Sequence, residues 1–482
     1  MTTHRFPQAL RAEWARFRSA RRWALAMAAS ALITVSIGLL IAGGARSSCV
    51  TWQGDGACPA PLVGPDGTAV NDKHYFVHQP LTGDGGITAR VSDMTGQMRM
   101  PDETPGVRNV KGGTVPWAKA GLLIRQSLKQ GTPYAAVMVT GGHGVRMQHN
   151  FVHDVAGGPV DGPRWLRLTR SGDTITGYES SDGKAWTEVG TAELTGLPET
   201  VEIGLFAASP SVVWQMAGAF AEATAVFDHI GLRGANGPWL RDDVGAQLTL
   251  GGKTPHHPGG VVESGGRLAV TGSGDIGPAT GGAGLRADLL LTGGVLGLVP
   301  VLVAAAAFVT AGGGRTPVAT GVVVGGASFV AGLVASGVVI PVGLILLRAN
   351  QNPIQPITLV TGLRVVVGWA VFTAVAAVLT AGLAALVKWA VVAVVPAVAL
   401  IVVPYLLATA GLAPWLLTIT PAAGFAITQS VPAFAHVDVD RSPIVGYYPL
   451  PPWAGLAVAC GYAALALAVA HRRGPRTSAT AG

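Results

Sequence analysis

Three carboxylates near the middle of the chain come closest to a catalytic arrangement. Glu179, Asp182 and Glu188 lie within one short stretch that also contains Ser and Gly. Hydrolysis of a glycosidic bond requires two carboxyl groups about 5 to 10 Å apart. These three residues flank predicted turns, where carboxylates are usually solvated. We therefore expect surface charges and no catalytic residue, and a membrane-bound glycan hydrolase is the least supported function.

The same region holds three large aromatic side chains, Trp165, Tyr178 and Trp186. Such rings can stack on sugars, which would make them a ligand face for an extracellular glycan. Large aromatic residues at alternating strand positions also fill the core of a β-sandwich. The sequence leaves both interpretations open.

Metal and nucleotide sites are not indicated. His149 and His153 have i, i+4 spacing, but no helix is predicted there to bring them together, and no third ligand accompanies them. The chain also lacks the phosphate-binding pattern G-x-x-x-x-G-K followed by Ser or Thr. We expect no metal, no cofactor and no ATP hydrolysis by this chain alone.

Two cysteines indicate an oxidising compartment. Cys49 and Cys58 flank a Gly/Asp segment just beyond the first apolar run, whereas Cys460 lies in the last such run. A disulfide between Cys49 and Cys58 would restrict the unfolded chain and add about 2 to 3 kcal/mol of stability. Two unpaired thiols are the alternative.

Hydropathy shows which elements position these residues. About 20 apolar residues cross the ~30 Å hydrocarbon core of a bilayer, and the chain has about six such runs. They are Trp23–Ala42, Leu289–Ala311, Val318–Leu346, Val365–Val387, Trp389–Leu412 and Trp453–Ala470. A cleaved signal peptide is the alternative for the first run, because Gly43, Gly44 and Ala45 are small.

Basic residues predict the orientation of the spans. Arginines crowd before the first span, and His471, Arg472 and Arg473 follow the last, so both termini are predicted to be cytoplasmic. The expected segments are 1–22, a cytoplasmic interfacial helix; 23–44, the first span; 45–285, an extracytoplasmic domain; 286–470, the remaining spans; and 471–482, a cytoplasmic tail. The net charge of +7 is concentrated at membrane boundaries, so lipid rather than nucleic acid is the expected partner.

Residues 45–285 predict an all-β domain. Short, often alternating runs are separated by Gly, Asp, Ser and Pro, with an Asp-Gly turn at Asp182. The predicted strands are His74–Val77, Ile87–Val91, Ala120–Ile124, Tyr134–Thr140, Gly144–Gln148, Trp165–Arg170, Thr174–Ser180, Trp186–Val189 and Val201–Ala207. A meander folded into a two-sheet sandwich is the expected arrangement.

The order of the motifs in this domain resembles a concanavalin A-like, laminin G-type jelly roll. The matching segments lie between Thr68 and Gly234 and include Trp117-Ala-Lys-Ala-Gly-Leu-Leu-Ile-Arg125, Tyr178-Glu-Ser-Ser-Asp-Gly-Lys-Ala-Trp186 and Val201-Glu-Ile-Gly-Leu-Phe206. That superfamily includes sugar-binding modules and glycanases. The Glu-x-Asp-x-Glu arrangement of its glucanases is missing here, so the resemblance implies a fold rather than an activity.

The N-terminal segment predicts an amphipathic helix at the membrane surface. Leu10, Trp14 and Phe17 fall on one helical face, and Arg11 and Arg18 fall on another. The segment is either a basic anchor or a docking surface for a cytoplasmic partner.

A second resemblance favours docking. Ala9-Leu-Arg-Ala-Glu-Trp-Ala-Arg-Phe-Arg-Ser19, just before the first span, resembles the elbow helix of type-two ABC exporter permeases. Further segments are similar to bacterial members that carry a jelly-roll insert after the first span: Leu363-Arg-Val-Val-Val-Gly368, Val403-Pro-Tyr-Leu-Leu-Ala408, Thr420-Pro-Ala-Ala-Gly-Phe-Ala-Ile-Thr-Gln-Ser-Val-Pro432 and Gly446-Tyr-Tyr-Pro-Leu-Pro-Pro-Trp453.

This resemblance implies a permease subunit in the bacterial plasma membrane. A separate ABC ATPase would drive it, and it would work as a homodimer or with a paired permease subunit. Glu13, Trp14, Arg16 and Arg18 would belong to the ATPase-docking or elbow region. A membrane-anchored glycan- or envelope-binding protein without transport is the alternative.

Two further features bear on transport. The family usually has a longer cytoplasmic stretch between spans two and three, whereas only Gly312-Gly-Gly-Arg-Thr-Pro317 stands there, so coupling uses other surfaces or is weakened. No Asp, Glu, Lys or Arg lies in the middle of a span, which disfavours an ion-coupled transporter.

The segment Pro414–Pro452 is either a re-entrant hairpin or an ordinary outer loop.

Overall fold

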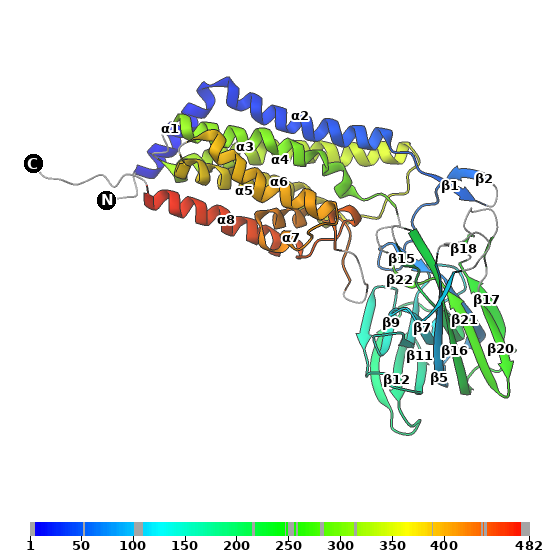
Figure 1. Cartoon of the computed structure of the whole chain (residues 1–482). Helices are drawn as coiled ribbons and strands as arrows, with labels where there is room; N and C mark the ends of the chain where they lie inside the picture. Colours follow the sequence, from blue (N-terminus) through cyan, green and yellow to red (C-terminus); the bar gives the residue numbers. More distant parts are fainter. Residues whose placement is uncertain are drawn as a thin grey trace, which may run out of the picture. The chain divides into compact units, whose positions relative to one another are not determined.

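The computed structural model describes residues 5–51, 54–100, 109–214, 217–245, 247–248, 255–256, 259–279, 284–312, 316–387, 389–434, 437 and 441–473. The chain forms two compact units (Figure 1). The helical unit comprises Met1–Ser47, Gly284–Ala433 and Asp438–Gly482, and the β unit comprises Ser48–Ala283 and Phe434–Val437.

The helical unit contains the predicted spans. Among the residues that the structure describes, six helices are long and apolar enough to cross a membrane, so the chain is a multi-pass membrane protein. They are α2 (Arg21–Gly44), 3-10 helix η1 (Ala287–Leu291) with α3 (Gly293–Ala311), α4 (Pro317–Ala349), α5 (Leu359–Val387), α6 (Ala390–Thr409) and α8 (Pro452–Arg473). Each overlaps a run predicted from hydropathy, which confirms that prediction.

Four shorter elements complete this unit: α1 (Arg5–Ser19), α7 (Leu416–Ile419), η2 (Pro421–Thr428) and η3 (Pro443–Val445). Helix α1 and the end of α8 lie at the same end of the bundle (Figure 1). The termini of the helical segments are therefore on one side of the bundle, as an even number of spans requires.

Segment η2 is buried along its whole length between spanning helices. It fits closely because glycines adjoin it: a side chain at Gly368 of α5 would clash with Ile427, and one at Gly455 of α8 would clash with the backbone of Ala423. An irregular segment enclosed by helices is the form in which non-helical backbone is tolerated at membrane depth. Whether Pro414–Pro452 is a re-entrant hairpin or an outer loop stays open, because the structure fixes the enclosure of this segment and not its depth in a membrane.

The β unit contains two large antiparallel sheets. One has the strand order β10-β9-β8-β7-β14-β4-β17, and the other is built on the path β13-β12-β11-β5-β16-β21-β20, with β15 beside β16 and β6 beside β5. The strands are β1 (Ser48–Thr51), β2 (Gly54–Ala57), β3 (Val70–Asp72), β4 (His74–Thr82), β5 (Gly85–Arg99), β6 (Val110–Gly112), β7 (Lys119–Arg125), β8 (Tyr134–Thr140), β9 (Val145–His149), β10 (His153–Ala156), β11 (Arg164–Ser171), β12 (Thr174–Ser180), β13 (Thr187–Glu193), β14 (Thr200–Ala208), β15 (Val212–Trp214), β16 (Ala217–Arg233), β17 (Leu240–Val244), β18 (Gln247–Leu248), β19 (Pro255–His256), β20 (Gly260–Ser264), β21 (Arg267–Ser273) and β22 (Ile276–Pro278).

The inner faces of the two sheets share one apolar core. Val77 and Leu205 come from the first sheet, and Leu168 and Phe227 come from the second, and all four are buried in a single cluster. The unit is therefore a two-sheet sandwich. The predicted strands all overlap observed ones, but the structure adds β16, β20 and β21 to the second sheet, beyond the region where strands were predicted.

The outer face of the first sheet is also covered. Phe76, Leu123, Tyr134 and Phe206 on that face pack under Phe151 of a connecting segment. As a result every residue of β7 and β8 is buried. This second, covered face holds the charged network described below.

The predicted disulfide is present. Cys49 on β1 is bonded to Cys58, just after β2, with Cα atoms 4.8 Å apart. The bond closes the hairpin that follows the first span. Cys460 on α8 is an exposed free cysteine.

Candidate functional site

Helix α1 presents only part of its predicted docking surface. Phe17 is buried and packs edge-on against Phe308 of α3, with ring centroids 5.6 Å apart. Trp14, predicted on the same apolar face, is 46% exposed and stacks on Phe17. Arg18 is exposed as well. Trp14 and Arg18 are therefore accessible to a partner.

Glu13 and Arg16 are instead bound to the ends of two spans. Thr316 Oγ1, at the N-terminal end of α4, donates to Glu13 Oε1 at 2.6 Å. Arg16 Nη2 donates to the carbonyl oxygen of Phe308, in the last turn of α3, at 3.0 Å. The two side chains pair with each other at 2.8 Å. An anion at a helix N-terminus and a cation at a helix C-terminus both interact favourably with the helix dipole, so each contact stabilises the helix end that it touches.

This Glu13–Arg16 pair holds α1 against the C-terminal end of α3 and the N-terminal end of α4. The guanidinium also lies 3.9 Å from the ring centroid of Phe308. A side chain at Gly312 would clash with the Arg16 guanidinium, so a glycine is needed for Arg16 to contact the end of α3. Arg315, in the middle of the α3–α4 connection, lies outside the described residues. Helix α1 therefore contacts the residues on both sides of this connection.

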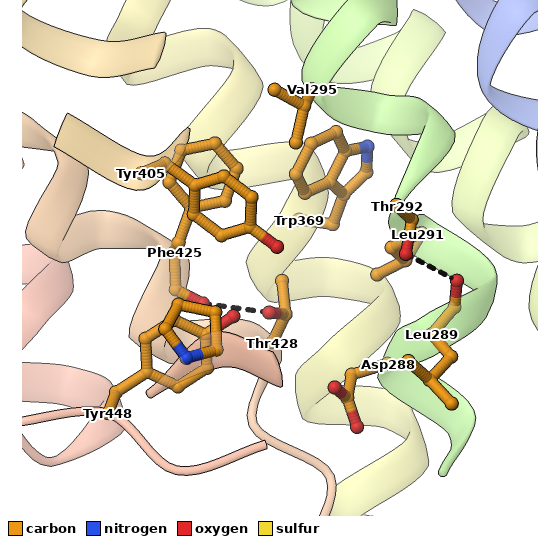
Figure 2. Close-up of a pocket in the computed structure, with 11 residues that line it drawn as sticks. Asp288, Leu289, Leu291, Thr292, Val295, Trp369, Tyr405, Phe425, Thr428 and Tyr448 are labelled. Atoms are coloured by element: carbon orange, nitrogen blue, oxygen red, sulfur yellow. Dashed lines mark hydrogen bonds between the residues drawn. The ribbon is translucent and has the colours of Figure 1, made fainter. Parts of the chain in front are cut away.

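A small polar cavity lies inside the helical unit (Figure 2). Its lining residues are Asp288, Leu289, Leu291, Thr292, Val295, Trp369, Tyr405, Phe425, Thr428, Pro443 and Tyr448. They come from η1, α3, α5, α6, η2 and η3, and from the segment before α8. The free volume of about 20 Å³ is enough for one water molecule but not for an organic substrate.

Asp288 at this cavity belongs to a buried ion pair that sequence reasoning missed. Arg286 Nε lies 3.2 Å from Asp288 Oδ1, and both residues are less than a tenth exposed. Ser430 Oγ donates to the same carboxylate at 2.5 Å. Arg286 also donates to the carbonyl oxygens of Pro443 and Ile444. The pair connects the start of the second span to η3 and to the segment after η2.

The α4–α5 connection holds both chain segments that lead to the β unit. Asn352 accepts a hydrogen bond from Ser47 Oγ at 2.8 Å and donates to the carbonyl oxygen of Ala45 at 2.9 Å. On the return segment, Leu285 N donates to Pro353 O at 2.8 Å, and Gln355 N donates to Leu285 O at 3.0 Å. A movement of this connection would therefore reach both segments.

The predicted ligand face lies on the outer side of the second sheet. Trp165, Tyr178 and Trp186 are all half-buried, so the alternative that they fill the core is wrong. The Arg167 guanidinium lies 3.8 Å from the Trp186 ring centroid, and the His229 ring centroid lies 5.0 Å from that of Trp165. The structure places the three rings on one sheet face, and protein side chains partly cover them.

The three carboxylates differ in exposure. Asp182 and Glu188 are exposed, as predicted. Hydrogen bonds from the backbone N–H groups of Lys184 and Ala185 lower the pKa of Asp182, which stabilises the turn. The prediction for Glu179 was wrong: this residue is buried and accepts a hydrogen bond from Gly158 N at 2.6 Å. Burial of Glu179 follows from its inward position on β12.

His149 and His153 stack on neighbouring strands, with ring centroids 4.4 Å apart. Burial, and secondarily the charge of His153, lowers the pKa of His149 to about 4. His153 contacts Asp66 at 3.0 Å. Among the described residues, no group of three or more His, Cys, Asp or Glu side chains is arranged to hold a metal ion.

The covered face of the first sheet holds a charged network that the sequence analysis did not find. Arg125 Nη2 donates to Asp72 Oδ2 at 2.9 Å, and Nη1 lies 3.1 Å from His74 Nε2. All three side chains are at most 1% exposed. Burial alone would raise the pKa of Asp72, but the His74 hydrogen bond and the charges around it lower the pKa. Burial lowers the pKa of His74, so a neutral ring accepts from Arg125.

A second histidine, His78, lies between two carboxylates. Nδ1 is 2.6 Å from Glu202 Oε2, and Nε2 is 2.9 Å from Asp242 Oδ2. Burial alone would lower the pKa of His78, but the two hydrogen bonds raise it above the ordinary value of 6.5. The charged imidazolium therefore connects β4 to β14 and to β17.

We expect the β unit to lose stability as the pH rises. Because the folded pKa of His78 is above 6.5, its contribution is complete below about pH 6.5 and is lost as the pH rises through the folded pKa. Thermal unfolding of the full chain in detergent, recorded by tryptophan fluorescence at increasing pH, measures this loss. His78→Gln should flatten the pH profile, whereas His153→Gln should leave it in place; equal profiles for all three proteins would contradict the assignment.

Comparison with known proteins gives limited similarity. No protein-family model matches the chain, and no curated protein matches it. A functionally unknown protein from Saccharomyces cerevisiae has a TM-score of 0.23 and 15% identity, over 38% of this chain and 85% of its own. The GH43 BlXynB protein from Bacillus licheniformis has a TM-score of 0.20 and 15% identity, over 31% of this chain and 27% of its own.

Proposed function

We propose that the chain is the permease subunit of an ATP-driven, ABC-type exporter in a bacterial plasma membrane. The helices would form the translocation path, both termini would be cytoplasmic, and a separate ATPase would supply energy. The sandwich would be a concanavalin A-like jelly roll, inserted on the extracytoplasmic side between α2 and η1. A second permease subunit, identical or different, would complete the transporter.

The observation that carries this proposal is the position of α1. The Glu13–Arg16 pair fixes the helix on the C-terminal end of α3 and the N-terminal end of α4, at the end of the bundle where α8 also ends (Figure 1). Arg11 and Arg18 are exposed on this fixed helix. A rigid basic helix beside a short connection supplies a docking surface where the longer loop of other permeases is missing.

The interior of the helical unit supports an external energy source. The buried pair of Arg286 and Asp288 is mutually neutralised and lies at the start of a span. The cavity beside it holds no more than a water-sized group. Neither the ion pair nor the cavity offers a path for a coupling cation through the bundle. We therefore propose ATP hydrolysis by the partner as the energy source for transport.

The test is co-purification of the full-length protein in mild detergent, with mass spectrometric identification of bound proteins. We expect an ATPase in near-equal amount. Arg11→Glu with Arg18→Glu should weaken the complex at least about tenfold, because two contacts of a basic surface become repulsive. Arg472→Glu with Arg473→Glu, at the end of α8, is the matched control and should retain the ATPase. Recovery of the wild-type protein without any ATPase would refute the proposal.

A glycan-binding protein without transport is the second candidate. The half-exposed rings of Trp165, Tyr178 and Trp186 on one sheet face favour it. The full-length protein in detergent would then bind purified cell-wall polymer, and Trp186→Ala would weaken that binding. Under the transporter proposal, ATPase recovery is unchanged by Trp186→Ala.

A further inference from the structure

An apolar groove runs between α1, α2 and α4. Trp14 and Phe17 line it from α1, Ala24 and Ala28 from α2, and Gly326 and Val330 from α4. Its free volume is about 380 Å³, and its lining residues carry no charge. Such a space in a membrane protein must be filled by hydrocarbon, because water there would contact only apolar surface.

None of the described residues of the helical unit fills this groove at Gly326. A side chain at that glycine would meet nothing within 4 Å. Its neighbours on α4 differ, because side chains at Gly325 and Gly332 would press on Val378 and Thr373 of α5. Gly325 and Gly332 therefore serve packing within the chain, whereas Gly326 leaves space for a molecule from outside it.

An arginine precedes the lining residues of α2 on the same helix. Arg21 precedes Ala24 and Ala28 by three and seven residues, so all three share one stripe of α2. Arg21 is exposed. Trp14 lies at the same end of the bundle, and tryptophan is enriched where hydrocarbon meets the polar head groups of a bilayer.

We propose that this groove holds one acyl chain of an anionic phospholipid whose phosphate pairs with Arg21. The apolar groove suits an acyl chain, and the indole of Trp14 suits the glycerol region at the membrane surface. The guanidinium of Arg21 suits the phosphate. The proposal does not depend on transport or on an ATPase.

Native mass spectrometry of the full-length protein in detergent tests the site. Phosphatidylglycerol and phosphatidylcholine are titrated separately, and retained lipid is counted per protein. We expect one tightly held phosphatidylglycerol on the wild-type protein. Gly326→Leu should weaken its binding about tenfold, because the new side chain displaces roughly two methylene groups of the acyl chain. Arg21→Gln should reduce the preference for phosphatidylglycerol about fivefold while phosphatidylcholine binding changes little.

Gly337→Leu is the matched control. Gly337 lies on the same face of α4, about 16 Å beyond Gly326 at 1.5 Å per residue, and a side chain there also meets nothing within 4 Å. This variant should bind lipid like the wild type. If Gly326→Leu binds lipid like the wild type, the proposal is overturned. It is also overturned if the wild-type protein is a dimer that Gly326→Leu converts to monomers without loss of lipid, because the groove would then belong to a second copy.

Discussion

Replacing Asp288 by Ala is expected to lower the free energy of unfolding of the helical unit by about 3 to 5 kcal/mol. The substitution leaves the Arg286 guanidinium buried without its counter-charge, and Ser430 Oγ loses its acceptor. Within the described part of the chain, Arg286 keeps the carbonyl oxygens of Pro443 and Ile444 as acceptors. Denaturant unfolding of the full chain in detergent micelles, followed by tryptophan fluorescence, measures the loss.

A double variant separates the charge from the packing. Arg286→Met with Asp288→Leu removes both charges and keeps much of the side-chain volume, so it should regain most of the stability. Its remaining deficit reports the hydrogen bonds to Ser430, Pro443 and Ile444. An Asp288→Ala protein as stable as the wild type would mean that water reaches the guanidinium, and the description of a buried pair would be wrong.

The same pair shows what sequence reasoning could not find. Long apolar runs predict spanning helices because chain length and bilayer thickness must match, and that prediction was confirmed. Arg286 and Asp288 look like ordinary polar residues at the start of a span. Their burial depends on Ser430, which is 142 positions away in the chain. No local pattern contains that information.

The β unit shows a second limit. Strand β16 alternates Ala221, Ala223 and Ala225 into the core with Glu222 and Thr224 on the other face. Alanine is depleted in strands, and these three inward positions lack the β-branched and aromatic residues that mark the strands that were predicted. The strand exists because it pairs along its length with β5. Pairing between distant segments outweighs local preference here.

The aromatic residues show a third limit. Alternation predicted that Trp165 and Tyr178 share a sheet face, and they do. The alternation could not decide whether the face with Trp165 is the inward one. Leu166 and Leu168 alternate with the same period on the opposite face, and either face could have been buried. Arg167, directly opposite Tyr178 on the neighbouring strand, supplies the guanidinium over Trp186. The exposure of these rings depends on such neighbours and not on residue type.

Replacing Asp72 by Ala is expected to have the largest effect in the β unit, again a loss of about 3 to 5 kcal/mol. Arg125 is 1% exposed and would keep its charge without the carboxylate. Gly131 N would also lose its acceptor, Asp72 Oδ2. Because Arg125 ends β7, amide hydrogen exchange of the β7 peptide in the full-length protein measures the change. Its protection should fall toward that of edge strands.

An exposed pair provides the control for this prediction. Arg267 is 64% exposed in its side chain and lies 4.0 Å from Asp228 in the second sheet. Arg267→Met should change stability by about 0.5 kcal/mol or less, because solvent screens such contacts. The contrast between the two variants compares a buried Arg–Asp contact with an exposed one, and Asp72→Ala additionally removes the acceptor of Gly131 N. Wild-type exchange of the β7 amides in Asp72→Ala would show that Arg125 finds another counter-charge, and the Asp72–Arg125 pair would then contribute no net stability to the sandwich.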